Sequence, residues 1–276
     1  ILAMYAKYKK DCVKYFDVMF AFAIWDEVEQ TLFAARDRFG EKPFFYHWNE
    51  STNTFYFASE MKALWAAGLE KKVHDKMFFQ FIASGYTQNP SDGSATFFAG
   101  IKKLPAHNYL LYKFSSKEIS ISSYWDIDLA KKSSLNESDA VEKFKELFTS
   151  SILRRLRSDV PVGTSLSGGL DSSSIVATIK KINPKSFSTF SAVFEGFEKD
   201  ESKYIKLITE KFDVQNFQVT PTVDGFVYDL EKLGYCQEEP FTSSSCYAQY
   251  KVYELAAKHG VKVLLDGQGA DETLAG

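Results

Sequence analysis

The chain contains 276 residues, 45% hydrophobic and 16% aromatic, which is enough for one large or two ordinary domains with apolar cores. A formal net charge of −3 argues against a surface that binds nucleic acid or an anionic membrane. No apolar run in the sequence approaches the roughly 18 residues that a membrane span requires. The cysteines, Cys12, Cys236 and Cys246, lack the spacing of metal ligands, so we expect free thiols and a cytoplasmic protein.

The first half of the chain carries the pattern of an antiparallel sheet with a few helices. Apolar stretches predict strands at 16–26, 31–35, 44–48 and 54–58, and 107–124 is again strand-like. The first of these is almost wholly apolar, which predicts a strand buried on both faces. Helices are expected near 1–10, 60–67 and 76–84. Short strands joined by turns favour an antiparallel arrangement.

The pattern changes near Trp125, where the polar segment 126–137 predicts a linker. Strands and helices alternate after it. Strands are expected at 160–166, 187–194, 216–219 and 261–265. Helices are expected around Val141–Ile152 and at 201–212, 222–235 and 245–259. Alternation of this kind predicts a doubly wound parallel sheet.

The strand at 160–166 leads into a loop with the sequence Ser-Gly-Gly-Leu-Asp-Ser-Ser, residues 167–173. Gly168 and Gly169 let the backbone approach a ligand closely, because no Cβ stands in the way. The N–H groups of the following helical turn, with the hydroxyls of Ser167, Ser172 and Ser173, form a cradle for an anion such as polyphosphate. No Lys follows the glycines, so the loop is not the common P-loop.

A second strand, at 263–265, also runs into a glycine turn with acidic residues at a helix start. Ligands of open parallel sheets bind beyond the carboxyl ends of the strands, so the two turns can face one crevice. Taken singly, Asp200, Asp271 and Glu272 are better explained as helix caps. Next to the serine–glycine loop, however, Asp171 and Asp271 are expected to offer hard oxygen ligands to Mg²⁺.

The loop at 167–173 resembles the pyrophosphate-binding loop of the N-type ATP pyrophosphatases. Together with residues 266–272, it is similar to the two ATP-site motifs of the glutamine-hydrolysing asparagine synthetases. The runs 19–26, 35–43 and 57–64 are similar to the glutaminase domain of the same family. The resemblance covers essentially the whole chain, as an internal piece of a longer protein.

This resemblance implies an α/β protein with two parts. Residues 1–124 would be the C-terminal part of a class II glutamine amidotransferase domain, a truncated N-terminal-nucleophile fold with αββα layers. Residues 125–276 would be the N-terminal part of an ATP pyrophosphatase domain with a doubly wound parallel sheet. The implied activity is the ATP-dependent amidation of aspartate to asparagine through aspartyl-AMP, with ammonia released from glutamine. The implied cofactors are ATP and Mg²⁺, and the full-length protein would be a homodimer.

Carried over by position, the resemblance also implies roles for individual residues. Adenosine would be held by Leu166, Ala192, Asp266 and Gly267. Pyrophosphate would be held by Ser167, Gly168, Gly169, Ser172 and Ser173. Mg²⁺ would be held by Asp171, itself part of the ATP site, and by Asp271. The segment 238–241 resembles a family segment near the substrate pocket, and we assign it no individual role.

The chain departs from the family pattern in several places. The family's glutaminase works through an N-terminal cysteine whose amine serves as base, but residue 1 is Ile and Cys12 lies in a helix pattern. We therefore expect no catalytic glutaminase residue in this chain, which alone would neither hydrolyse glutamine nor complete asparagine synthesis. Val18 stands where a glycine is usual, and Gln268 replaces an acid found in some relatives.

Two alternatives stay open. One is a paralogue that applies the same adenylation chemistry to another acid, as β-lactam- or peptide-cyclising relatives do. The other is a non-catalytic relative that serves as an interaction module, against which the retention of both ATP motifs speaks.

Overall fold

The computed structural model describes residues 1–183, 187–198 and 200–274, which form two compact units. The N-terminal unit comprises Ile1–Lys132 and Gly234–Thr242, and the C-terminal unit comprises Ser133–Leu233 and Ser243–Gly276. The sequence pattern did not predict that residues 234–242 belong to the first unit. The division of the chain between residues 124 and 125 into two family domains stays a prediction.

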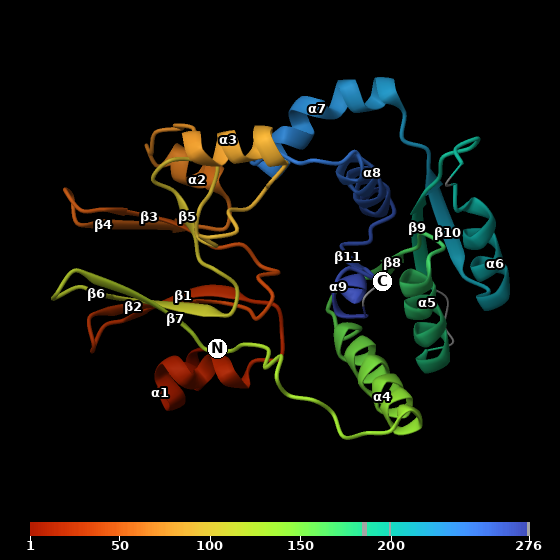
Figure 1. The fold of residues 1–276 in the computed structure, drawn as a ribbon, viewed down its shortest axis with the longest axis horizontal. Coiled ribbons are helices and arrows are strands. Elements are labelled where there is room, and N and C mark those ends of the chain that lie inside the picture. Colours follow the sequence, from red (N-terminus) through yellow and green to blue (C-terminus); the bar gives the residue numbers. More distant parts are fainter. Residues whose placement is uncertain (184–186, 199, 275–276) are drawn as a thin grey trace. The chain divides into compact units, whose positions relative to one another are not determined.

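The N-terminal unit contains two antiparallel sheets, so the antiparallel pairing predicted from the strand pattern is confirmed, whereas the pattern did not show that the strands divide into two sheets (Figure 1). One sheet has the order β1-β2-β6-β7, with strands Ala21–Asp26, Thr31–Arg36, Asn108–Lys113 and Glu118–Ser123. The other has the order β4-β3-β5, with strands Thr54–Ala58, Phe45–Asn49 and Lys102–Lys103. The two-residue strand β5 has no periodicity of its own in the sequence, because it is too short to show one.

The expectation of a doubly buried strand over 16–26 was wrong in two respects. The strand β1 begins only at Ala21, after a 3-10 helix, η1, at Lys9–Tyr15. Its side chains are also not all covered, since Trp25 is 45% exposed. Ala21 and Ala23 on one face and Ile24 on the other do pack in apolar clusters, whereas Trp25 lies near the end of the edge strand β1, where less of the neighbouring layers covers it.

Apolar clusters hold this unit in four layers, helix, sheet, sheet and helix, which confirms the αββα expectation (Figure 1). Helix α1 (Leu2–Tyr8) and η1 pack on the first sheet through Tyr5, Val13 and Phe33. The two sheets pack on each other through residues such as Leu110 and Tyr46. Helix α2 (Met61–Ala66) covers the second sheet, and α3 (Asp75–Ser84) packs on residues 95–98.

The C-terminal unit is built on a parallel sheet with the order β10-β9-β8-β11. Its strands are β8 (Val162–Ser165), β9 (Ser188–Ala192), β10 (Gln215–Val219) and β11 (Val263–Leu265). Its helices are α4 (Glu137–Arg155), α5 (Leu170–Ile182), α6 (Ser202–Phe212), α8 (Ser245–Lys258) and α9 (Ala270–Leu274), together with the part of α7 (Val223–Gln237) that precedes Gly234. Ile152 and Ile175 pack on one face of the sheet, whereas Val252 and Ala256 pack on the other. Helices on both faces confirm the doubly wound expectation.

The segment Gly234–Thr242 is anchored to the N-terminal unit by two adjacent carboxylates. The Glu238 carboxylate accepts the backbone N–H groups of Met61 and Lys62, both at 2.8 Å. Glu239 accepts the N–H of Phe97, also at 2.8 Å. Glu238 thereby satisfies the open N–H groups at the start of α2, which no local side chain caps.

None of the helices in the described part of the chain is both long and apolar enough to cross a membrane.

Candidate functional site

The loop between β8 and α5 is shaped by a glycine that no other residue could replace without strain. Gly168 has φ +88°, a conformation that L side chains rarely adopt. A Cβ at this position would lie 2.9 Å from the Cβ of Tyr204 and 3.1 Å from the N atom of Ile205, at the start of α6. The glycine therefore lets the loop lie directly against α6, and it turns the chain into α5.

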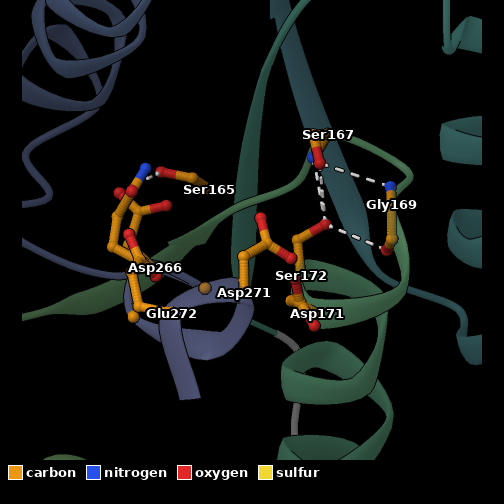
Figure 2. Close-up of a pocket in the computed structure, with 11 residues that line it drawn as sticks. Ser165, Ser167, Gly169, Asp171, Ser172, Asp266, Asp271 and Glu272 are labelled. Carbon is orange, nitrogen blue, oxygen red and sulfur yellow. Dashed lines mark hydrogen bonds between the residues drawn. The ribbon is translucent and has the colours of Figure 1, made fainter. Parts of the chain in front are cut away.

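Hydroxyl groups brace the same loop from inside. The hydroxyl of Ser172 accepts the N–H of Ser167 at 3.3 Å, lies 3.1 Å from the Ser167 hydroxyl and donates to the carbonyl of Gly169 at 3.3 Å (Figure 2). The N–H of Gly169 donates to the Ser167 hydroxyl at 3.2 Å. The loop is thus held open in a preformed curve, which is the arrangement that suits an anion site at a helix start.

Ser173, by contrast, does not line the pocket beside this loop. Its hydroxyl oxygen is buried and has no hydrogen-bond partner among the described residues. Its N–H donates to the Gly169 carbonyl at 3.1 Å. In this conformation Ser173 is not oriented to hold a ligand, and its proposed contact with pyrophosphate stays a prediction.

The second glycine turn lies against the first because β11 and β8 are parallel neighbours. Leu265 is the register partner of Thr164, so both strands end at the same edge of the sheet. A Cβ on Gly267 would lie 2.9 Å from the Cβ of Asp171 in the opposite loop. Only a glycine permits this approach. The predicted convergence of the two turns on one crevice is confirmed.

The two turns line a pocket of about 210 Å³. The predicted site residues that line it are Ser167, Gly169, Asp171, Ser172, Asp266, Gly267 and Asp271. The others, Leu166, Gly168, Ser173 and Ala192, are not among its lining residues. Ser165, Gln268, Gly269 and Glu272 complete the lining.

Sequence reasoning left Ser165 out of the site. The signal was available, since Ser165 is a polar residue at the carboxyl end of the strand that precedes the loop. Leu166 follows it but is only 1% exposed, and its N–H donates to the Phe190 carbonyl within the sheet. The backbone N–H of Leu166 is therefore already used in a hydrogen bond to β9.

Four carboxylates line the pocket, those of Asp171, Asp266, Asp271 and Glu272. Unscreened, they would repel a polyphosphate, so the pocket suits that ligand only together with a cation. Mg²⁺ is usually held by one or two carboxylates plus phosphate oxygens, which Asp171 and Asp271 can provide. No group of three or more His, Cys, Asp or Glu side chains could hold a metal ion within the described residues. The donor set therefore fits Mg²⁺ that arrives with a nucleotide.

Asp266 is held at one end of the pocket by two hydroxyl donors. Its Oδ2 accepts from Ser165 Oγ at 3.3 Å and from Tyr253 Oη at 3.4 Å. Burial, followed by the negative charge of Asp266 and the hydrogen bond to it, raises the pKa of Tyr253 to about 12. Tyr253 is therefore a neutral donor at physiological pH. It comes from α8, and nothing in the sequence marked it.

In the N-terminal unit, Cys12 behaves as a structural residue. Its side chain is fully buried in the cluster beneath the first sheet. Burial raises the pKa of its thiol, which disfavours the thiolate that a nucleophile requires. These features agree with the expectation that Cys12 does not serve as a glutaminase nucleophile.

The charged run at 36–42 has a structural explanation. The buried carboxylate of Asp37 accepts the N–H groups of Phe20 at 3.2 Å, Glu41 at 2.9 Å and Lys42 at 3.0 Å. The guanidinium of Arg36 donates to the carbonyls of Gly40, Lys42 and Leu104. The Asp37 carboxylate and the Arg36 guanidinium therefore stabilise a turn next to the sheets, and neither is needed to explain a ligand site.

Comparison with known families agrees with this organisation. Residues 1–125 match the family described as glutamine amidotransferase domain. Residues 143–276 match the family described as asparagine synthase. Together the two matches extend over nearly the whole chain.

Individual relatives match the chain from end to end. A protein of Methanocaldococcus jannaschii named "Putative asparagine synthetase (glutamine-hydrolyzing) 2" is 35% identical over 100% of this chain and 53% of its own length. Asparagine synthetase (glutamine-hydrolyzing) 1 of Bacillus subtilis is 31% identical over 100% of this chain and 42% of its own length. The amidase chry2 of Gibberella zeae is 28% identical over 100% of this chain and 42% of its own length. The chain thus spans about half the length of the curated relatives it matches.

Proposed function

Because the chain belongs to the family of glutamine-hydrolysing asparagine synthetases, we propose that it serves the ATP-dependent amidation of aspartate to asparagine. Residues 1–124 are then part of the domain that releases ammonia from glutamine, and residues 125–276 are part of the domain that uses ATP. The observation that carries the proposal is the single pocket lined by both glycine turns, each at the end of a parallel strand.

The chemistry explains why ATP is needed. A carboxylate resists attack by ammonia because it is anionic and has no good leaving group. In the proposed reaction, a side-chain oxygen of aspartate attacks the α-phosphorus of ATP, and the bond to the β-phosphate breaks to release pyrophosphate. Ammonia then attacks the acyl carbon of aspartyl-AMP and loses a proton, and AMP departs.

We assign the phosphates and the adenosine of ATP to opposite ends of the pocket. The loop of Ser167, Gly169 and Ser172 binds the β- and γ-phosphates, exchanging its internal hydrogen bonds for bonds to phosphate oxygens. Gly168 and Ser173 belong to the same phosphate-binding loop by family resemblance. Adenosine lies toward Asp266 and Gly267, with Leu166 and Ala192 behind it.

Asp171 and Asp271 would hold Mg²⁺ at the phosphates. When bound, Mg²⁺ neutralises the charge that develops on the departing pyrophosphate. The two carboxylates come from the first turns of α5 and α9, the helices that follow the two glycine turns. They therefore fix the two loops relative to the phosphate chain.

Titration calorimetry of the 276-residue chain with Mg²⁺ and a non-hydrolysable ATP analogue tests the nucleotide site. We expect one saturable site, at least tenfold weakened by Asp171→Asn, since a charged metal ligand is lost. Asp224→Asn is the control, because Asp224 is exposed at the start of α7 and does not line the pocket. The absence of any binding, in a chain shown to be folded by circular dichroism, would contradict the proposal.

We further propose that the chain by itself forms asparagine neither from glutamine nor from free ammonia. Asparagine production by this 276-residue chain, measured with glutamine and with ammonia, would contradict that part of the proposal. The same assay with ammonia alone separates the loss of the glutaminase from the loss of the synthetase.

A second candidate is an enzyme that activates a different acid in the same way. The whole-chain match to the amidase chry2 supports this second candidate. Release of pyrophosphate by the longer protein that contains this chain, with aspartate and with a panel of other acids, separates the two candidates. Aspartate alone should stimulate release if the first proposal is right.

The free state of all three cysteines suits a cytoplasmic location, which we include in the proposal. A homodimer of the longer protein also follows from the family resemblance, and analytical ultracentrifugation would test it.

A further inference from the structure

Asp266 has an unusual setting among the acids of the pocket. One of its carboxylate oxygens, Oδ2, accepts hydrogen bonds from Ser165 and Tyr253, which come from β8 and α8. The other oxygen, Oδ1, has no hydrogen-bond partner among the described residues. Asp266 and Ser165 line the pocket, whereas Tyr253 supports Asp266 from outside the lining.

The donors are neutral hydroxyls, so they orient the carboxylate without cancelling its charge. A lysine or arginine in their place would form an ion pair and weaken the carboxylate as an acceptor. The carboxylate is therefore oriented by two groups on one oxygen and keeps a full acceptor on the other. Such an arrangement fits a carboxylate that binds a hydrogen-bond donor of a ligand.

The position of Asp266 in the pocket restricts which hydrogen-bond donor of a bound nucleotide it can accept. Figure 2 shows Asp266 and Ser165 at one end of the pocket and Ser167 and Gly169 at the other, with Asp271 between them. A negative carboxylate repels phosphate, so Asp266 cannot serve the phosphate chain directly. The first neutral donors that a nucleotide presents beyond its α-phosphate are the ribose hydroxyls.

We infer that Ser165 and Tyr253 are positioning residues that fix the Asp266 carboxylate as an acceptor for the ribose hydroxyls of the bound nucleotide. The inference rests on the proposed ATP site, but it adds a specificity that the serine–glycine loop cannot provide. Phosphate contacts do not distinguish a ribonucleotide from a deoxyribonucleotide. A hydroxyl bound to a charged acceptor does, because the acceptor loses its partner in the deoxy analogue.

The test compares the binding of ATP, 2′-deoxy-ATP and 3′-deoxy-ATP, each with Mg²⁺, to the 276-residue chain by titration calorimetry. The wild-type chain should bind at least one deoxy analogue about tenfold or more weakly than ATP, as expected for a hydrogen bond to a charged group. Ser165→Ala and Tyr253→Phe should each reduce this preference severalfold, by weakening ATP binding while leaving the binding of that deoxy analogue nearly unchanged.

Two controls separate positioning from a general structural effect. Ser165→Thr keeps the hydroxyl and should keep most of the preference for ATP. Tyr228→Phe removes a tyrosine hydroxyl from a side chain of α7 that is 88% exposed, and should change nothing. Thermal melting of each variant shows whether it is folded.

Three results would overturn the inference. Equal affinity of the wild-type chain for all three nucleotides would leave the ATP site intact but remove any recognition of ribose hydroxyls. Equal weakening of all three nucleotides by Ser165→Ala and Tyr253→Phe would show a purely structural role. No binding of any nucleotide would refute both the inference and the proposed function.

Discussion

Replacing Glu238 with glutamine should loosen the start of α2 in the N-terminal unit. The Glu238 side chain is 6% exposed, and its two oxygens accept the N–H groups of Met61 and Lys62 at 2.8 Å each. Its carboxylate also lies 3.5 Å from the Lys62 ammonium. The first N–H groups of a helix have no partner within the helix, so α2 depends on this distant carboxylate.

The magnitude follows from the kinds of bond that change. A hydrogen bond to a charged group is worth about 1.5–3 kcal/mol, and one between neutral groups about 0.5–1.5 kcal/mol. Glutamine offers one neutral oxygen, so one of the two bonds is weakened, and the other is lost because an amide NH₂ faces an N–H. The weakened bond costs about 1–1.5 kcal/mol and the lost bond about 1.5–3 kcal/mol, so we expect a total loss of about 2.5–4.5 kcal/mol, which corresponds to about a 70- to 2000-fold change in the equilibrium for local opening.

Amide hydrogen exchange at Met61 and Lys62 measures this opening directly. Both amides should exchange about 70- to 2000-fold faster in Glu238→Gln than in the wild-type chain. The amide of Met77 is an internal reference, because it donates to His74 at the start of α3. Glu231→Gln is the matched variant, since Glu231 is exposed on α7. Unchanged exchange at Met61 and Lys62 would refute the reasoning that Glu238 caps α2.

Three further predictions concern packing and pH. Gly267→Ala should abolish nucleotide binding in titration calorimetry while the chain stays folded, because the added methyl group would lie 2.9 Å from Asp171 Cβ; wild-type affinity would contradict this. Gly163→Ala should lower the free energy of unfolding by about 1–3 kcal/mol, since its Cβ would lie 2.8 Å from a carbonyl oxygen of β9. Urea denaturation measures that loss, and Gly234→Ala is the control because it has open space. Asp26→Asn should make the melting temperature depend less on pH at acidic pH. The pKa of Asp26 is lowered to about 2, chiefly by the hydrogen bond from Lys9, whereas the pKa of aspartate in an unfolded chain is about 3.9. Its stabilisation is therefore complete above about pH 4 and is lost as the pH falls through 2. Melting temperatures of wild type and variant between pH 2 and 6 should converge toward pH 2, and parallel curves would refute the assignment.

Much of the C-terminal unit could be predicted from the sequence because its signals are local. The apolar run ending at Ser165, the two glycines after Ser167 and the helical spacing of Ile175, Val176 and Ile179 lie within a short stretch. Each depends on the geometry of a strand, a turn or a helix, which neighbouring residues set on their own. Alternation of such units restricts the sheet to parallel pairing, and the edge where the strands end is then the site.

The N-terminal unit shows where local pattern fails. The apolar stretch before Asp26 has the composition of a buried strand, but only its second half is one. Its first part, residues 16–20, is a loop that follows η1, and Phe16 and Phe20 pack in the cluster beneath the sheet. An apolar composition indicates that a segment is buried, but it does not indicate which strands pair with it. Whether a strand lies at the edge or in the centre of the sheet depends on distant residues, here 31–36 and 108–113.

By itself, the sequence determined most of the order of helices and strands, the two glycine turns and the resemblance to a known family, because each follows from residues close together in the chain. Only the tertiary structure decided that Glu238 caps a helix 177 residues away, and that Tyr253 and Ser165 hold Asp266. These contacts join side chains whose separation along the chain carries no period or motif. They exist because packing the sheets and helices brings those side chains within hydrogen-bonding distance.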